Sequence, residues 1–428
     1  MEVIKYTSIE DLESALKRPE LNTEYLTGTV KNILQRVKTS GDAALFELTE
    51  QFDKTKLDQL QVDAKEIEVA ANEVSQELKS AILQAKLNIE KFHAAQKREP
   101  LTVETMPGVK CMRKSVPIEK VGLYIPGGTA PLFSTVLMLG IPAQLAGCKK
   151  VVLCTPPDKN GKINPAILYS ASIVGISQIY KVGGSQAIAA LAYGTESILK
   201  VNKIFGPGNQ YVTKAKQLVN MEGTSIDMPA GPSEVAVIAD KNADPAFVAA
   251  DLLSQAEHGE DSQVLLLSDS DQLIDSVLKE IEEQLKELPR VEVAKRCLSL
   301  SKAICTKSLD KCIEISNNYA PEHLIINCED AEKIAEKITQ AGSVFIGAYT
   351  PESAGDYASG TNHTLPTNGA AEAYSGVSLD SFMKEITFQQ ITKEGIKNLG
   401  PVVETMAEAE GLMAHKNAVS IRLNELKR

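Results

Sequence analysis

Histidine is scarce in this chain of 428 residues, and His258 is the histidine whose neighbours most suggest a binding site. The segment DPAFVAADLLSQAEHG predicts a helix that is capped by Asp244, begins at Pro245 and stops at Gly259. Gln255 and His258 are three residues apart, so they share one face at the end of that helix. An amide oxygen and an imidazole nitrogen placed in this way can bind one metal ion, although a satisfied polar helix end would have the same sequence.

A second candidate is the adjacent pair Glu322 and His323 in the segment NYAPEHLIIN. The pair follows Pro321 at a predicted turn between a helix and a strand, where both side chains can face one cleft. A carboxylic acid beside an imidazole is the combination that stepwise proton transfer requires. A solvated polar turn would look the same, so the pair by itself leaves both interpretations open.

Asp356 and a pair in the last predicted helix complete the candidates. Asp356 lies in a stretch from Ser353 to Gly376 whose richness in Gly, Ser, Thr and Asn indicates a functional loop or disorder. Flanking glycines permit a close backbone approach there, and a carboxylate is a suitable zinc ligand. Glu410 and His415 are five residues apart and not quite on one helical face, and a merely solvated helix remains the alternative for them.

The elements that must position these residues follow a repeated pattern of strand, glycine-rich turn and helix. Before this pattern, residues from Ser8 to about Glu99 have the spacing of helices, and Pro100 closes that stretch. One α/β series runs from VGLYI to KIFGPGN, and a second runs from EVAVIAD to SVFIG. The alternation is typical of parallel sheets covered by helices, so we expect two α/β units as the core.

Three glycine turns of the first series are suited to bind a pyrophosphate. VGLYIPGG, VGGSQA and FGPGNQ each precede a helix-like run, and a helix N-terminus attracts phosphate. The strict GxGxxG pattern is absent, and no acidic residue stands convincingly about twenty positions on to hold a ribose. Spacing alone therefore leaves both dinucleotide binding and plain tight turns open.

Composition narrows the classes of function. The formal net charge of −11 argues against a general attraction for nucleic acid or for a membrane of anionic lipid. No apolar run approaches the roughly 20 residues that span a bilayer, and the start lacks the pattern of a signal peptide, so we expect a cytoplasmic protein. The seven cysteines include no CxxC pair, which predicts small buried residues rather than a disulfide framework or a thiolate zinc site.

Eight long segments, in order and over nearly the whole chain, resemble the histidinol dehydrogenase family. They are VGLYIPGGTAPLFSTVLMLGIPA, KVGGSQAIAALAYGT, IFGPGNQYV, IDMPAGPSEV, LLSQAEHG, NYAPEHL, TPESAGDYASGTNHTLPT and EAEGLMAHKNAVSIR. The resemblance implies an NAD-dependent dehydrogenase that contains Zn2+ and removes four electrons from its substrate. The expected reaction takes L-histidinol through L-histidinal to L-histidine with two NAD+, in the last steps of histidine biosynthesis.

The resemblance also assigns roles to the candidate residues. It implies that Glu322 and His323 are the proton-transfer pair. It further implies zinc ligation by Gln255, His258, Asp356 and His415; substrate contacts by Ser233, Gln255, His258, His323, Asp356, Glu410 and His415; and NAD contacts by Tyr124, Gln186 and Asn209.

The family architecture implies two incomplete Rossmann-like parallel α/β domains with small helical domains at the N- and C-termini. We expect an N-terminal helical segment over 1–24, a discontinuous first domain over 25–122 and 235–378 that holds the zinc and catalytic residues, a second domain over 123–234 on the NAD side, and a C-terminal helical segment over 379–428. The family is a homodimer with exchanged terminal segments, so Glu410 and His415 would serve the partner's site.

Other functions compete with this one. A related zinc and NAD dehydrogenase acting on another small alcohol, such as a sulfonated diol, would keep the same zinc set, but Glu410 would repel that anion. A binding protein without activity would be expected to lack some of these residues, and a zinc hydrolase would leave the glycine turns without a role. A thiohemiacetal on Cys111 or Cys148 is disfavoured, since neither cysteine has an adjacent base.

Overall fold

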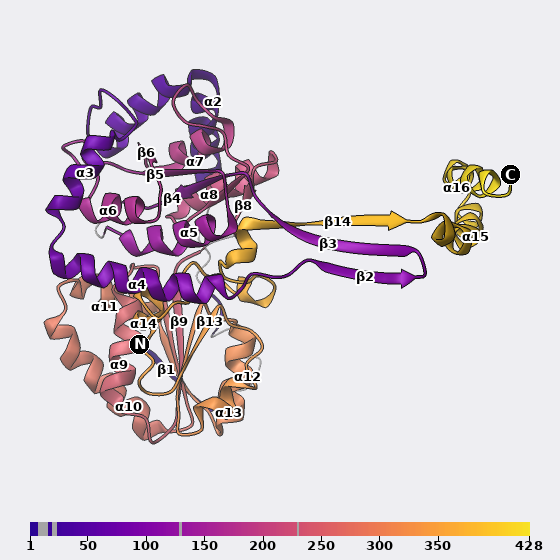
Figure 1. The fold of residues 1–428 in the computed structure, drawn as a ribbon. Helices are drawn as coiled ribbons and strands as arrows, with labels where there is room; N and C mark the ends of the chain where they lie inside the picture. The colour runs from indigo at the N-terminus through magenta and orange to yellow at the C-terminus, as the bar shows by residue number, and fades with distance from the viewer. Residues whose placement is uncertain (7–15, 19–23, 128–130, 229–230) are drawn as a thin grey trace.

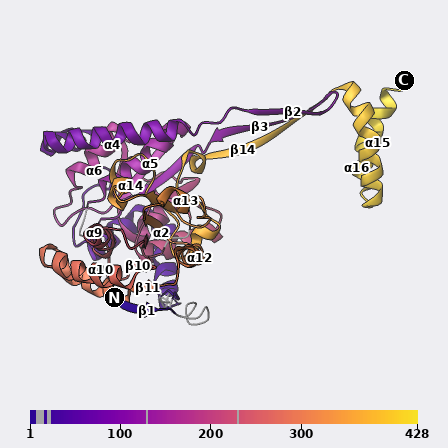
Figure 2. The ribbon, with the colours of Figure 1, turned by 90° about the horizontal axis from the view of Figure 1, so that it is seen from below.

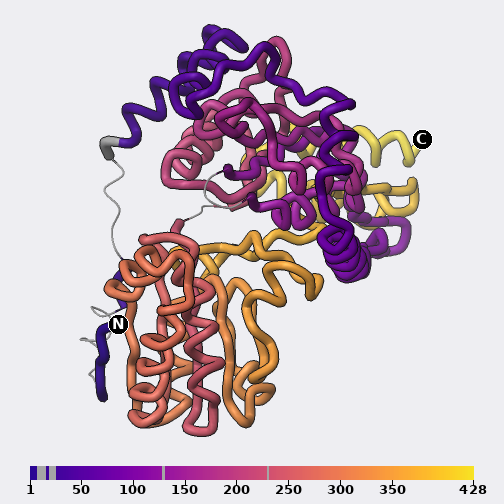
Figure 3. The backbone as a smooth tube through the Cα atoms, turned by 90° about the vertical axis from the view of Figure 1, so that its left-hand side faces the viewer, coloured from indigo at the N-terminus to yellow at the C-terminus, as the bar shows by residue number. Residues whose placement is uncertain are grey.

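The computed structural model describes residues 1–6, 16–18, 24–127, 131–228 and 231–428. Two lobes, each built on a parallel sheet, stack one above the other in Figure 1, and a β-ribbon carries two C-terminal helices away from them. Figure 3 shows the two lobes from the side. In the described part of the chain, no helix is both long enough and apolar enough to cross a membrane.

The upper lobe of Figure 1 is built on a five-stranded parallel sheet with the order β6-β5-β4-β7-β8. Its strands are β4 (Lys120–Tyr124), β5 (Lys150–Thr155), β6 (Gln178–Lys181), β7 (Lys203–Phe205) and β8 (Ser225–Ile226). Its helices include α5 (Phe133–Ala146), α6 (Pro165–Ile173), α7 (Gly184–Tyr193) and α8 (Gln210–Met221). Counted from β4, the order is the 3-2-1-4-5 of a dinucleotide-binding fold without its sixth strand.

The lower lobe repeats this order in a six-stranded parallel sheet, β1-β11-β10-β9-β12-β13. Its strands are β1 (Glu2–Lys5), β9 (Glu234–Ala239), β10 (Gln263–Ser268), β11 (Lys302–Cys305), β12 (His323–Asn327) and β13 (Ser343–Ile346). Its helices include α9 (Pro245–Ala256), α10 (Asp271–Gln284), α11 (Val291–Leu300), α12 (Leu309–Tyr319) and α13 (Ala331–Ala335). Strands β9 and β12 are buried along their whole length, as central parallel strands are. The predicted fold class, two incomplete Rossmann-like domains, is confirmed.

The N-terminal helices pack on the upper lobe, whereas the expected domain plan grouped 25–122 with 235–378. Helix α2 (Glu24–Asp53) contacts α7 and α8, α3 (Ala64–Glu73) contacts α6, and α4 (Gln76–Ala94) contacts α5. Their apolar side chains join the hydrophobic clusters of the upper sheet. The grouping of 25–122 with 235–378 came from the resemblance, and the spacing of these helices could not test it, because helical periodicity identifies an apolar face without showing which surface that face covers.

The start of the chain also differs from the helical segment expected over 1–24. Residues Glu2–Lys5 form β1, which pairs in parallel with β11. This strand extends an existing sheet edge, whose backbone groups are available for pairing. Residues 7–15 and 19–23 of the expected segment lie outside the described residues.

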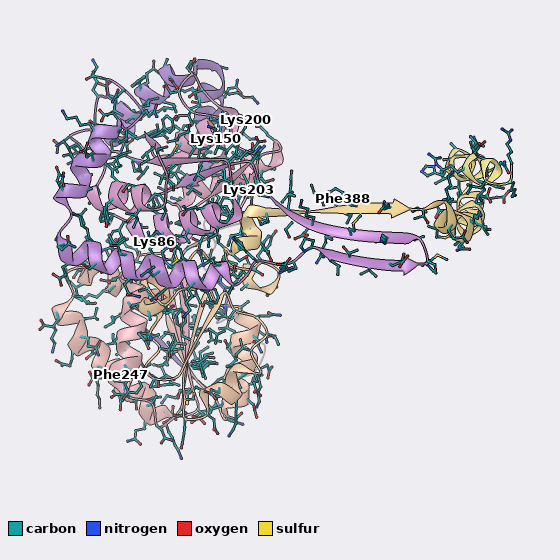
Figure 4. All side chains as sticks on the ribbon, in the orientation of Figure 1. Lys86, Lys150, Lys200, Lys203, Phe247 and Phe388 are labelled. Atoms are coloured by element: carbon teal, nitrogen blue, oxygen red, sulfur yellow. The ribbon has the colours of Figure 1, made fainter. Side chains whose placement is uncertain are left out.

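A three-stranded antiparallel ribbon, in the order β14-β3-β2, projects from the lobes (Figures 1 and 2). It consists of β2 (Leu101–Met106), β3 (Val109–Pro117) and β14 (Met383–Ile391), and it leads into α15 (Lys393–Ala409) and α16 (Met413–Glu425), which pack on each other. The segment 379–428 is therefore helical from Lys393, after a strand that the helical expectation did not include. Phe388 on the ribbon (Figure 4) and Met406 on α15 are exposed, which is typical of a surface that another chain covers.

Candidate active site

The backbone of a single residue, Glu234, positions both members of the proposed proton-transfer pair. Glu322 precedes β12 and His323 begins it, and both side chains are buried. The backbone N–H of Glu234 donates to Oε2 of Glu322 at 2.9 Å, and Nδ1 of His323 lies 3.1 Å from the Glu234 carbonyl oxygen. Because a carbonyl can only accept, Nδ1 carries a proton and Nε2 is the nitrogen directed to other groups. Both side chains therefore contact the same backbone unit, while the prediction that they face one cleft stays a prediction.

Two carboxylates from one short helix surround the ring of His323. Helix α14 (Glu352–Tyr357) places Glu352 and Asp356 four residues apart, so both side chains lie on one helical face. Oδ1 of Asp356 lies 3.5 Å from Nε2 of His323, and Oε1 of Glu352 lies 3.5 Å from Nδ1. One ligand atom from each of these three residues lies within 4.8 Å of the others, which is close enough to hold a metal ion. Sequence reasoning missed Glu352, although its i,i+4 spacing to Asp356 was a usable signal.

The charges of this cluster are strongly interdependent. Burial raises the pKa of Glu322 to about 8, against the opposing charge of His323. Burial also raises the pKa of Glu352 to about 8. Burial alone would lower the pKa of His323, but Glu352, Glu322 and Asp356 together hold it well above its usual value. The pKa of Asp356 is lowered despite its burial, because the imidazole of His323 lies 3.5 Å away and the imidazoles of His363 and His258 are also near. The cluster can therefore hold and move protons near neutral pH.

Gln255 and His258 approach this cluster from α9. Gln255 is fully buried, and neither its amide nitrogen nor its amide oxygen has a hydrogen-bond partner among the described residues. His258 follows the end of α9, and although its side chain is exposed, nearby protein removes enough water to lower its pKa. Asp356 opposes that shift, and α14 packs on α9, so His258 and Asp356 are close in space. An unpaired buried amide beside an imidazole and a carboxylate fits an ion with nitrogen and oxygen ligands.

Glu410 and His415 do not join these residues within one chain. Glu410 caps the end of α15 and His415 lies on α16, and both side chains are exposed. These helices lie beyond the far end of the ribbon, away from both lobes (Figures 1 and 2). Ser233, in contrast, immediately precedes Glu234 at the start of β9 and lies beside the cluster.

A cavity of about 680 Å³ opens at the carboxyl ends of β4 and β5 in the upper lobe. Its lining includes the three residues predicted to contact NAD: Tyr124, Gln186 and Asn209. The Tyr124 hydroxyl accepts a hydrogen bond from the backbone N–H of Gly184, where α7 begins without a side-chain cap. An uncapped helix start at the carboxyl edge of a 3-2-1-4-5 sheet is where such folds bind the pyrophosphate of a dinucleotide.

The start of α5 links the cavity to the acid–imidazole cluster. Pro131 lines the cavity, and Thr135, in the first turn of α5, lies 3.1 Å from Nε2 of His363 through its hydroxyl. Nδ1 of His363 lies 2.8 Å from the backbone carbonyl of Asp356. The contact with Asp356 is local in the sequence, whereas the contact with Thr135 joins residues that are far apart in the chain and so had no sequence signal. A ligand in the cavity and a substrate at the cluster would therefore lie on two sides of this connection.

All seven cysteines are free, and five of them are buried, as expected for small apolar residues. Cys111 and Cys148 are partly exposed. Burial raises the pKa of the Cys148 thiol to about 11, which makes it a poor nucleophile near neutral pH.

A cavity at the carboxyl edge of a Rossmann-like lobe, together with a buried cluster of carboxyl and imidazole groups in a second such lobe, is typical of an NAD-dependent oxidoreductase. A family model described as histidinol dehydrogenase matches residues 16–423. The chain is 60% identical over 427 residues to a histidinol dehydrogenase of Bacteroides thetaiotaomicron, covering 100% of both chains, and 55% identical over 421 residues to that of Escherichia coli strain K12, covering 98% and 96%. A crystal structure of histidinol dehydrogenase from Elizabethkingia anophelis superposes with a TM-score of 0.98 at 56% identity, covering 100% of this chain and 99% of the other. The chain belongs to the histidinol dehydrogenase family.

Proposed function

We propose that the protein oxidises L-histidinol to L-histidine through L-histidinal, with two molecules of NAD+ accepting the two hydrides. The observation that carries the proposal is the pair Glu322 and His323, held by one backbone unit and connected through α5 to a cavity suited to a dinucleotide. An alcohol-to-acid oxidation needs one group that removes the hydroxyl proton of the alcohol and later that of the aldehyde hydrate, and another group that activates water. This pair contains both kinds of group.

Histidine and carboxylate side chains divide the proton transfers. Nε2 of His323 removes the hydroxyl proton of the alcohol as hydride leaves its carbon. Glu322 then takes a proton from the water that adds to the aldehyde, while the protonated His323 returns its proton to the carbonyl oxygen. The neutral His323 then deprotonates the resulting hydrate for the second oxidation. A raised pKa of about 8 makes the Glu322 carboxylate a stronger base than an exposed one. Ser233, which immediately precedes β9, would contact the substrate.

Zinc would be held by Gln255, His258 and Asp356 of one chain and His415 of the partner subunit. When bound there, zinc would coordinate the imidazole and amine nitrogens of the substrate, which are good zinc ligands. The proposal is supported by the unpaired amide of Gln255 and by the proximity of His258 to Asp356. Glu410 of the partner subunit would pair with the substrate ammonium group.

The position of the C-terminal helices supports an exchange between subunits. His415 and Glu410 are exposed at the end of a ribbon that points away from their own lobes. Exposed apolar side chains on the ribbon and on both helices offer a surface for a second copy of this chain. A homodimer that exchanges these segments would complete two sites at once.

The reaction is tested by its stoichiometry. Purified protein supplied with zinc, limiting L-histidinol and excess NAD+ should form two NADH for each histidinol consumed. One NADH per substrate would mean that oxidation stops at the aldehyde. No NADH from histidinol, but turnover of another alcohol such as a sulfonated diol, would favour the related dehydrogenase activity instead.

The ligand set is tested by zinc content, because His323, Glu352 and Asp356 form a competing group of possible ligands. Gln255→Leu and Glu352→Gln each change one buried residue that belongs to only one of the two sets. We expect Gln255→Leu to lower bound zinc per subunit and Glu352→Gln to retain it. Loss of zinc from the Glu352 variant alone would assign the ion to the competing group and leave His323 unavailable as a base.

A further inference from the structure

The cavity of the upper lobe contains a carboxylate that has no structural partner. Asp53, the last residue of α2, lines the cavity together with Phe52. Its Oδ2 is buried and has no hydrogen-bond partner among the described residues. Burial without a compensating contact raises the pKa of Asp53 to about 6. A buried carboxylate oxygen without a partner costs stability, so its position needs a reason other than folding.

The position of Asp53 at the end of its helix makes the loss of stability larger. The C-terminal end of a helix carries unpaired carbonyl groups and a partial negative charge, which disfavours a second negative charge there. Helix α2 has no basic residue in its last turn to offset this. Neither local packing nor helix electrostatics therefore explains an acid at this position, and a ligand that donates hydrogen bonds to it would.

Asp53 lies where a dinucleotide fold needs an acid. Its charge raises the pKa of Tyr124, the last residue of β4, so the carboxylate is close to that phenol at the carboxyl edge of the sheet. In folds of this strand order, an acid near this edge accepts hydrogen bonds from the hydroxyls of the adenosine ribose. The usual acid follows the glycine turn in sequence, whereas Asp53 precedes β4 and reaches the cavity from α2.

The other charged groups that line the described part of the cavity are Asp158 and Lys162. Asp158 is exposed, and its Oδ1 already accepts hydrogen bonds from the backbone N–H groups of Asn160, at 2.9 Å, and Lys162, at 2.8 Å. The carboxylate of Asp158 therefore stabilises its own turn. Asp53 is the acid of the described cavity lining whose carboxylate carries an oxygen without a hydrogen-bond partner.

We infer that Asp53 determines the preference of this protein for NAD over NADP. Its carboxylate accepts hydrogen bonds from the ribose hydroxyls of NAD and repels the 2′-phosphate of NADP. The inference rests on the proposed function only in that the cavity is taken to hold the dinucleotide. It adds a residue that sets coenzyme specificity and assigns no part of the chemistry to it.

The test compares Asp53→Asn, which keeps the shape and removes the charge, with two matched acids. Glu50→Gln removes an exposed acid from the same last turn of α2 but outside the cavity lining, and Asp158→Asn neutralises the other acid of the cavity. Binding of NAD, NADP and ADP-ribose to the intact protein is measured by calorimetry, with thermal unfolding as the control for folding. We expect Asp53→Asn to weaken NAD and ADP-ribose roughly 10- to 100-fold, the range for a hydrogen bond to a charged group. NADP binding should stay the same or tighten, so the ratio of the two affinities falls.

The melting temperature should not fall in Asp53→Asn, because an unfavourable charge has been removed. Glu50→Gln should leave the ratio of affinities unchanged. An unchanged ratio in Asp53→Asn, or a larger fall in Asp158→Asn, would overturn the inference. Absence of histidinol-dependent NADH formation by the unaltered protein would instead overturn the proposed function, while the binding ratio would still decide the role of Asp53.

Discussion

The two lobes share one strand order and use opposite edges of their sheets. In the upper lobe, the cavity opens at the carboxyl ends of β4 and β5. In the lower lobe, the polar cluster gathers at the amino ends of the strands, where Glu234 begins β9 and His323 begins β12. The carboxyl edge of β9 is closed by Asp240, which accepts hydrogen bonds from the N–H groups of Asn242 and Glu329. Two similar folds thus have different functions, because the function of each lobe depends on which edge of its sheet holds polar groups that are free to bind a ligand.

The largest effect should come from His323→Asn, which tests whether chemistry belongs to the lower lobe alone. Loss of the imidazole should slow both oxidations roughly 100- to 10,000-fold, the usual contribution of general acid–base catalysis. NAD affinity should remain within about twofold, because the cavity lies in the other lobe. Rapid kinetics with histidinol and histidinal, together with calorimetry of NAD binding, check both statements. A large loss of NAD affinity would contradict the division between the lobes.

Glu322→Gln should separate the two oxidations. The glutamine oxygen can still accept the hydrogen bond from the N–H of Glu234, so the local structure is retained. Because only the second oxidation needs an activated water, turnover of histidinal should fall by roughly 100-fold or more and that of histidinol by less than about tenfold. Feeding each substrate separately provides the measurement, and equal losses on both would refute the assignment.

A mixed dimer tests whether the lower-lobe site needs a residue from a second chain. Homodimers of Asp356→Ala and of His415→Ala should each be inactive. If His415 crosses to the partner, one site of a mixed dimer carries both defects and the other carries neither. Equal amounts give about half mixed dimers, so roughly a quarter of the original activity should return after joint unfolding and reassembly. Mixed dimers without activity would place all ligands on one chain.

The smallest effect concerns the upper lobe and the pH dependence of its stability. The pKa of Asp53 is raised from 3.8 to about 6 on folding, so the folded chain keeps this proton more tightly than the unfolded chain. The resulting stabilisation is complete below pH 3.8 and is lost as the pH rises to about 6. Partial exposure limits the change to about 1–2 kcal/mol. The free energy of unfolding, measured with urea on the NAD-free proteins, should fall more steeply with rising pH in the unaltered protein than in the Asp53→Asn variant. The same dependence on pH in both proteins would contradict the absence of a partner for Asp53.

Sequence by itself determined the elements and much of the site. Alternating strands and helices predicted two parallel α/β units, whereas the glycine turns left phosphate binding and plain tight turns open. The resemblance named Tyr124, Gln186 and Asn209, all of which line one cavity. Two local motifs could be recognised in the sequence: the helix end at Gln255 and His258, and the turn at Glu322 and His323. Each depends on the spacing and polarity of residues that are close together in the chain. The segment resemblance then supplied the roles that spacing left open.

Tertiary structure alone decided which distant groups meet. Glu234 holds Glu322 and His323 through its backbone, and any residue type except proline could supply those two groups, so the sequence gives no sign of the contact. Asp53 became a candidate only when burial left its oxygen unpaired, since an acid at a helix end is otherwise unremarkable in sequence. The helices of residues 24–94 joined the upper lobe, and His415 was carried away from its own lower lobe. The physical reason is common to all of these: periodicity reports that a face is apolar or polar, and only packing selects its partner.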